Sequence, residues 1–290
     1  MMQASLVEPL IKFASKARLF VAKQSAKFDT MTTFLQDIPE IGLTFTYSPI
    51  VDSALAYTKE HCSPSIYNHA VRAAYWAAII AKKGESLSSS SLDLEIVLLS
   101  CILHDMGWSE TAALISEDKR FEVDGANIAR DFLLKNKQQD RAKNGGIWDE
   151  DRIQRCWDAI ALHTTPSIAA HAAPEVALTN MGVAADFMGP AFPNGPGENN
   201  IITIEEYRAV MVLFPRLDFT ATGLKQVMCG LCRRKPVTTY DNFLGIFGLK
   251  FGIDGKGAGK EDFERDWEEN QAVNFLVSGL NSLQQLDTQL

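Results

Sequence analysis

The sequence has few of the features that would place a chain in a membrane or on nucleic acid. Its longest unbroken apolar run, residues 73–81, is far shorter than the roughly 18 residues that a membrane-spanning helix needs. Its 28 basic residues are outnumbered by 36 acidic ones, and the resulting net charge of −8 disfavours binding to a phosphate backbone. We therefore expect a small-molecule partner, and neither a nucleic acid nor a membrane.

The sequence also lacks the marks of a disulfide-stabilised secreted protein. Its 5 cysteines are an odd number, and no signal-peptide pattern precedes them. Cys229 and Cys232 form a single CxxC pair without a second pair, so we expect them to pack between helices and not to bind zinc. These features favour a reducing, cytoplasmic location. The basic first 27 residues could act as a targeting segment, but an ordinary helix with a basic face is the preferred interpretation.

Strands are missing from the pattern as well, because no series of strictly alternating, β-branched segments occurs. Apolar residues recur instead at helical spacing, so the predicted fold class is all-α. The expected helices cover 65–83, a segment ending near His104, 123–135, 149–163, 174–188, 204–213, 224–232 and 261–283. Gly107 is expected to end its helix in the left-handed conformation.

The composition that remains is typical of a soluble globular protein, with 46% apolar and 22% charged residues. A chain of 290 residues exceeds the usual size of one domain but can still form one. We expect a single large domain over residues 44–290, preceded by an N-terminal segment of residues 1–43.

Histidine is scarce, and one of the 5 histidines, His104, stands directly before Asp105 at the end of the apolar run 96–103. A buried carboxylate without a compensating charge costs on the order of 3–5 kcal/mol, and a divalent metal supplies that charge. The dipeptide alone is a weak signal, because a histidine and an aspartate at a helix end also pair with nearby groups and the backbone.

Two further residues strengthen the metal hypothesis. His69 lies on an earlier expected helix, and Asp186 stands in the apolar stretch 183–188, where a carboxylate also needs a partner. Two imidazoles and two carboxylates suit one divalent ion, most simply zinc, with a position left open for water. Iron(II) and manganese(II) accept the same ligands. The predicted metal ligands are His69, His104, Asp105 and Asp186.

These residues carry a family resemblance. The order His69, His104-Asp105, Asp186 resembles the metal-binding pattern of the HD-domain superfamily. Four segments are more closely similar to fungal cyanamide hydratase-like HD proteins, namely YNHAVR at 67–72, LHDMG at 103–107, RFEVDGA at 120–126 and KPVTTYDNF at 235–243. The resemblance implies an HD-domain helical bundle in which one divalent metal activates a water molecule. It also implies a homo-oligomer.

The resemblance implies a metal-dependent hydratase, a lyase that adds water to a small nitrile-type substrate such as cyanamide to give urea. His163 is the candidate proton shuttle, because an imidazole can transfer protons in both directions near neutral pH. Asp105 is the second candidate catalytic residue, while Arg72 and Trp108 are the candidate substrate-binding residues. Whether the substrate is cyanamide, a larger nitrile or an isonitrile stays open at this point.

Two alternatives stay open too. An HD-type phosphohydrolase acting on a nucleotide or another phosphomonoester could use Arg72 to hold phosphate, but Trp108 beside the His-Asp pair favours a small uncharged substrate. A non-catalytic helical binding module could use the metal as a structural staple, although two carboxylates and an open position are more typical of catalysis. The other aromatic residues on helices, Trp76, Trp148, Trp157 and Phe187, are expected mainly in the core.

Overall fold

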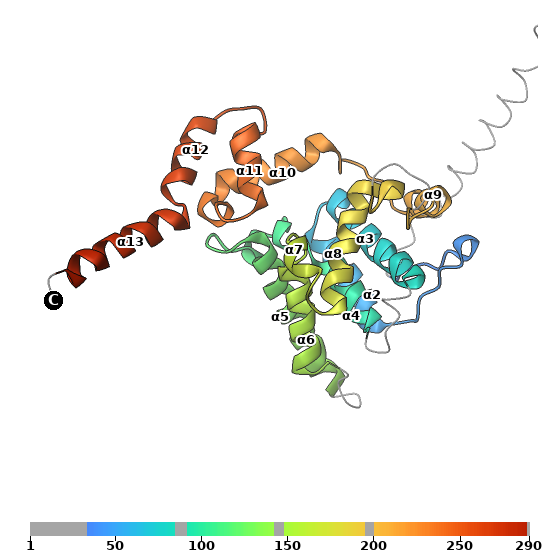
Figure 1. The fold of residues 1–290 in the computed structure, drawn as a ribbon. Helices are drawn as coiled ribbons and strands as arrows, with labels where there is room; N and C mark the ends of the chain where they lie inside the picture. The colour runs from blue at the N-terminus through green and yellow to red at the C-terminus, as the bar shows by residue number, and fades with distance from the viewer. Residues whose placement is uncertain (1–33, 85–91, 142–147, 195–199, 289–290) are drawn as a thin grey trace, which may run out of the picture. The chain divides into compact units, whose positions relative to one another are not determined.

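The computed structural model describes residues 34–84, 92–141, 148–194 and 200–288, and within these ranges the chain is helical without a β-strand (Figure 1). The all-α prediction is therefore confirmed. The chain divides into two units, Met1–Leu35 and Gln36–Leu290, and the helices described below belong to the second. The basic N-terminal segment of residues 1–27 lies outside the described residues.

The α-helices keep the labels of Figure 1 and follow one another along the chain. They are α2 (Pro49–His61), α3 (Pro64–Lys83), α4 (Leu94–Leu103), α5 (Phe121–Arg141), α6 (Glu150–Ala161), α7 (Pro166–Ala169), α8 (Pro174–Met188), α9 (Ile204–Leu213), α10 (Ala221–Arg234), α11 (Phe243–Phe251), α12 (Lys260–Glu269) and α13 (Ala272–Asp287). None of them combines the length and the apolar character needed to cross a bilayer.

The helices that carry the site begin at local capping signals. The side chain of Ser63 accepts a hydrogen bond from the backbone of Ile66 at the start of α3, where Pro64 occupies the first turn. Asp93 caps α4 in the same way, and Pro174 opens α8. Such caps satisfy backbone N–H groups that have no partner within the helix, so they fix where each helix starts.

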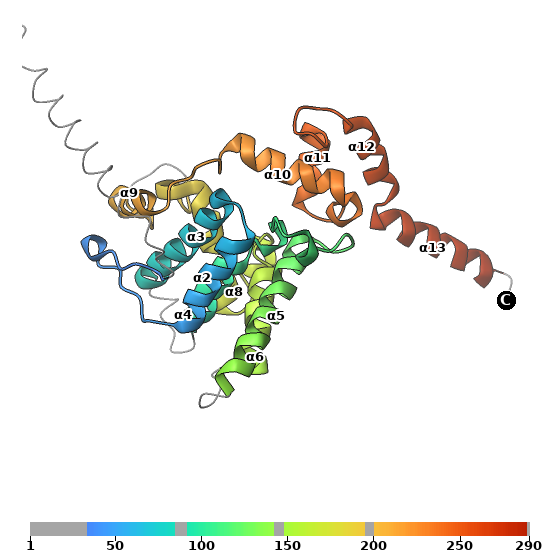
Figure 2. The same ribbon diagram turned by 180° about the vertical axis from the view of Figure 1, so that it is seen from behind.

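The core is a bundle in which α3 packs against α8 and α4, and α6 packs against α4, α5 and α8 (Figures 1 and 2). Nearly every residue of α3 from His69 to Ile80 is buried, and many of them are alanines. Small residues let the backbones of α3 and α8 approach closely, since a Cβ placed on Gly182 would lie 2.6 Å from the carbonyl oxygen of Ala73. This close contact holds α3, which carries His69, against α8, which carries Asp186.

Three sequence expectations need correction. The expected helix over 261–283 is two helices, α12 and α13, because Asn270 and Gln271 turn their side-chain amides back onto the last carbonyls of α12. Helices α2, α7 and α11 are additional to the expected set. Gly107 does not adopt a left-handed conformation, and lies instead in a short 3₁₀ helix, η3 (Met106–Trp108).

Gly107 is required for a different reason, which a substitution can test. A Cβ at this position would collide with the backbone of Phe121, so we expect Gly107→Ala to lower the free energy of unfolding by about 2–3 kcal/mol. Gly279→Ala is the matched control, because a Cβ there meets nothing within 4 Å and an alanine in a helix is better by about 0.5–1 kcal/mol. Urea denaturation of both variants measures the difference, and equal stability would contradict the close approach.

The cysteines agree with the sequence interpretation. All 5 are free and buried. Cys232 accordingly packs between helices, where its thiol lies 3.4 Å from the carbonyl oxygen of Leu244 on α11. Burial raises the pKa of the Cys62 and Cys232 thiols, to about 12 and about 11 respectively, so both stay protonated at neutral pH.

Candidate metal centre

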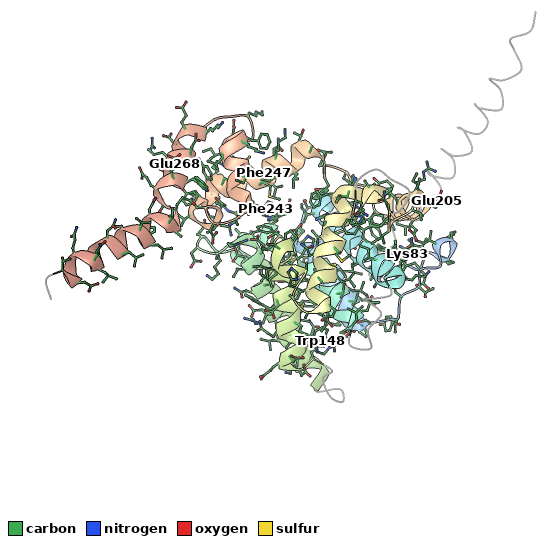
Figure 3. The ribbon with its side chains drawn as sticks, in the orientation of Figure 1. Lys83, Trp148, Glu205, Phe243, Phe247 and Glu268 are labelled. Atoms are coloured by element: carbon green, nitrogen blue, oxygen red, sulfur yellow. The ribbon has the colours of Figure 1, made fainter. Side chains whose placement is uncertain are left out.

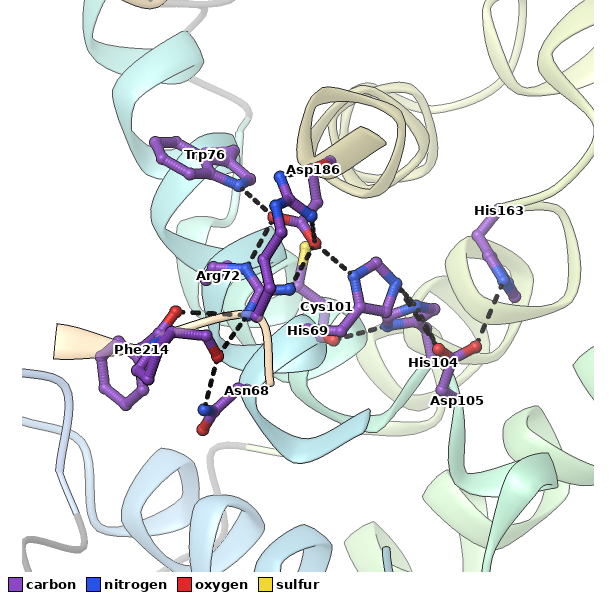
Figure 4. A network of polar contacts seen from close by, with 12 residues as sticks. Asn68, His69, Arg72, Trp76, Cys101, His104, Asp105, His163, Asp186 and Phe214 are labelled. Atoms are coloured by element: carbon purple, nitrogen blue, oxygen red, sulfur yellow. Dashed lines mark hydrogen bonds and ion pairs between the residues drawn. The ribbon is translucent and has the colours of Figure 1, made fainter. Parts of the chain in front are cut away.

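Three buried histidines, which Figure 4 labels, hold their rings in the same way. In each of His69, His104 and His163, Nδ1 lies within hydrogen-bonding distance of an oxygen that can only accept. Nδ1 therefore donates its hydrogen, and Nε2 is left with a lone pair in the neutral ring. The acceptors are Asp186 Oδ2 at 2.7 Å, the carbonyl oxygen of Cys101 at 2.7 Å and the carbonyl oxygen of Ile160 at 2.6 Å.

The three Nε2 atoms face Asp105, which is only 2% exposed. The distances to its carboxylate oxygens are 3.1 Å from His104, 3.5 Å from His69 and 3.9 Å from His163. Neither oxygen of Asp105 has a partner in hydrogen-bonding geometry, and the Nε2 atoms of His69 and His104 are 3.3 Å apart. Lone pairs and a carboxylate in one dry space repel one another unless a positive charge lies among them.

This arrangement fits a divalent metal. One ligand atom from each of His69, His104 and Asp105 lies within 4.8 Å of the others, and all three residues are buried. Two imidazole nitrogens that bind zinc at about 2.0–2.1 Å in tetrahedral geometry lie roughly 3.3–3.4 Å apart. The observed 3.3 Å between Nε2 atoms matches that spacing. The donor set, together with the carboxylate that lacks partners, therefore suits the predicted ion.

The pKa shifts of His104 and Asp105 also show that positive charge is favoured beside the buried carboxylate. Burial lowers the pKa of His104, but the charge of Asp105, the hydrogen bond to the Cys101 carbonyl and the charge of Asp186 together outweigh burial, so the net shift is upward. Burial would likewise raise the pKa of Asp105, but His104 and then His69 lower it. Burial, followed by the charge of His104, lowers the pKa of His163 to about 4. His163 is therefore neutral at pH 7 and its Nε2 can accept a proton.

Asp186, one of the four predicted ligands, lies on the other side of His69. Its carboxylate accepts hydrogen bonds from Arg72 Nε and Nη2, both at 2.8 Å, from Trp76 Nε1 at 2.9 Å, and from His69 Nδ1 at 2.7 Å (Figure 4). These donors lower the pKa of Asp186 despite its burial. The structure thus brings together His69, His104 and Asp105, and it places Asp186 behind the first of them.

Arg72 does not occupy the position expected of a substrate-binding residue. Its side chain is fully buried, its Nε and Nη2 bind Asp186, and its Nη1 donates to the carbonyl oxygens of Phe214 and Pro215, both at 3.2 Å. These four hydrogen bonds occupy four of the five donors of a guanidinium group. These contacts favour a role for Arg72 in holding Asp186, and its role in substrate binding stays a prediction.

A cavity of about 260 Å³ borders the metal centre. His69, His104 and Asp105 form one wall of it, and Trp108, a predicted substrate-binding residue, also lines it. Phe187 lines it as well and is 49% exposed, so the expectation that Phe187 belongs to the core is corrected. Trp76 and Trp148, in contrast, are buried as expected.

Sequence reasoning missed most of the far wall of this cavity. Leu224 and Met228 on α10, together with Phe243 and Phe247 on α11 (Figure 3), line it. The only signal for their involvement was the segment 235–243, which carries part of the family resemblance. Nothing in the spacing of these residues distinguishes an aromatic lining from a packed core.

Glu122 was also missed. It is fully buried and accepts hydrogen bonds from Thr164 Oγ1 at 2.6 Å and from Arg120 Nη2 at 2.9 Å. Because Thr164 follows His163 and lines the cavity, Glu122 fixes the loop that carries the candidate proton shuttle. Glu122 belongs to the third of the four resembling segments, 120–126, which was the available signal.

A helical bundle that gathers two histidines and an unpartnered carboxylate beside a cavity is typical of a metal-dependent enzyme. The sequence model of the HD domain matches residues 66–203, and this range holds all the predicted metal ligands. HD domains are mostly metal-dependent hydrolases, and the group of His69, His104 and Asp105 could hold such a metal, so both findings support an enzyme. A search of curated proteins found no significant match.

Proposed function

We propose that this protein is a metal-dependent hydratase that adds water to the carbon–nitrogen triple bond of a nitrile-type substrate, with the conversion of cyanamide to urea as its simplest reaction. One observation supports this most. The metal centre opens into a cavity whose lining, in the described part of the chain, contains no lysine or arginine. Such a cavity suits a neutral substrate.

His69, His104 and Asp105 would hold the metal, and Asp186 would orient His69 from behind and not complete the ligand set. Zinc is the ion that this donor set suits best, while iron(II) and manganese(II) are compatible with it. A divalent ion bound here supplies Lewis acidity, which lowers the pKa of water from 15.7 to about 7 and makes a nucleophile available at neutral pH.

His163 is placed to move the proton. Its Nδ1 is held by the carbonyl oxygen of Ile160, so Nε2 faces the metal centre with a free lone pair. With a pKa of about 4 the ring is neutral at pH 7, and Nε2 can take a proton from the attacking water. The same atom can return that proton to the substrate nitrogen, so no group needs to leave. Asp105 would act as a metal ligand, and its negative charge would stabilise the metal cation beside His69 and His104.

Phosphomonoester hydrolysis is less well supported. A phosphate needs cationic donors, and the described residues that line the cavity supply none, while the guanidinium of Arg72 is bound to Asp186. Arg216 also points its guanidinium at Asp186, with Nη2 2.6 Å from the backbone oxygen. The two arginines nearest the centre therefore support the scaffold.

The test is a direct comparison of the two reactions. We expect the purified, metal-loaded protein to form urea from cyanamide and to release no phosphate from nucleoside monophosphates. Urea is measured by a coupled ammonia assay in which the urease step is omitted in the blank, and phosphate by a colorimetric assay. His163→Gln is expected to retain the metal and lose about 10²–10⁴-fold in kcat. Phosphate release without urea formation would overturn the proposal.

A further inference from the structure

The cavity is much larger than cyanamide. Cyanamide has three non-hydrogen atoms and fills roughly two to three water volumes, or about 60–90 Å³. The cavity offers about 260 Å³. An apolar cavity of about 150 Å³ in another protein is large enough to bind benzene. The space beside the metal centre can therefore hold a cyano group together with a ring.

The lining beyond the metal centre is apolar and largely aromatic. Trp108 and Phe121 stack at 4.9 Å between ring centroids on one side of the cavity. Phe121 also belongs to one apolar cluster with Met228, against which Leu224 and Phe247 pack. The centre and the aromatic wall thus belong to one continuous space, which favours a ligand with a polar reacting end and an apolar body.

We infer that the physiological substrate class of this site is a neutral nitrile-type compound that carries an aromatic substituent of about one ring, and that cyanamide itself is a poor substrate. This inference rests on the proposed hydratase function. For an aryl cyanamide, the oxygen of water bonds to the nitrile carbon as the first carbon–nitrogen π bond is lost, and the second is replaced by a carbon–oxygen π bond as the resulting iminol rearranges. Both hydrogens end on the former nitrile nitrogen, so the product is an aryl urea, with no redox change and no leaving group.

Phenylcyanamide and cyanamide are the matched probes, because they share the reacting group and differ by one phenyl ring. Burying that ring against the aromatic wall is expected to raise kcat/KM by about 10- to 100-fold, mostly through a lower KM. Phenylurea and urea formation are followed by chromatography with the metal-loaded protein. If cyanamide is hydrated and phenylcyanamide is hydrated no faster, the hydratase function stands and the inferred substrate class is overturned.

A substitution in the apolar lining of the cavity tests whether the cavity causes the preference for phenylcyanamide over cyanamide. Leu224→Trp adds bulk at a partly buried lining position, and we expect it to lower the ratio of kcat/KM for phenylcyanamide over cyanamide at least tenfold. Gln226→Trp is the control, because Gln226 is exposed on the same helix and does not line the cavity. Equal ratios in both variants and the wild type would contradict the inference.

Binding gives a readout that does not depend on turnover. Phenylurea, the product, is expected to bind the metal-loaded protein at least tenfold more tightly than urea and to quench tryptophan fluorescence, because Trp108 lines the cavity. If neither cyanamide is hydrated but phenylurea binds with this preference, the proposed hydration is wrong while the aromatic specificity of the site is supported. If phenylurea binds no better than urea, the inferred specificity is wrong.

Discussion

Asp105→Asn is expected to leave the purified protein without stoichiometric metal and to lower kcat/KM for hydration on the order of 1,000-fold or more. The carboxylate of Asp105 is buried, has no hydrogen-bond partner among the residues that the structure describes, and lies within 3.5 Å of the Nε2 atoms of both His69 and His104. An amide keeps the shape of the side chain but removes the negative charge that neutralises the ion. The metal therefore loses its only carboxylate ligand in the group.

Metal content is measured by mass spectrometry after dialysis, and thermal denaturation is measured with and without added zinc. Zinc should raise the melting temperature of the metal-free wild type, since a ligand that binds only the folded state stabilises it, and should not raise that of Asp105→Asn. His171→Ala is the control, because His171 is exposed and should keep full metal content and activity. One bound metal per chain in Asp105→Asn would show that the ligand group is assigned wrongly.

Asp186→Ala is expected to lower the free energy of unfolding by about 3–5 kcal/mol, because it leaves the fully buried guanidinium of Arg72 without its carboxylate. Replacing both residues, as Arg72→Met with Asp186→Ala, should recover part of this loss, since no buried charge is then unpaired. Chemical denaturation measures both variants in the metal-free protein, which separates the effect from metal binding.

Asp262→Ala is the matched control for that prediction. Asp262 forms an ion pair with Arg265 in which both side chains are more than half exposed, so its removal should cost less than about 1 kcal/mol. A similar small loss in Asp186→Ala would mean that the buried network contributes little. If the double variant is less stable than Asp186→Ala alone, the loss does not come from the unpaired arginine.

Much of the metal centre could be predicted because its evidence is local. His104 and Asp105 follow a run of eight buried residues along α4, and a carboxylate in such a position needs a partner wherever the chain folds. The helix that carries His69 is marked by a serine, a proline and helical periodicity. The helical fold and the set of interacting histidines follow from such signals.

The partners of Asp186 and Arg72 could not be predicted in the same way. Spacing places Arg72 on the helix of His69, three residues later, but it does not say that its guanidinium turns to α8 and meets Asp186. That contact depends on how closely α3 and α8 pack. The size of the cavity is likewise a tertiary property, because its walls come from segments more than 100 residues apart in the sequence.

The HD domain match ends at residue 203, whereas Leu224, Met228, Phe243 and Phe247 come from α10 and α11. The predicted metal ligands thus lie within the matched range, whereas one part of the cavity lining comes from the stretch that follows it. A chimera that exchanges only residues 221–251 should change which molecules are accepted while the reaction stays the same. Two proteins with similar HD-domain sequences could then act on different substrates. Sequence similarity confined to the HD domain would be a poor guide to the substrate of either one.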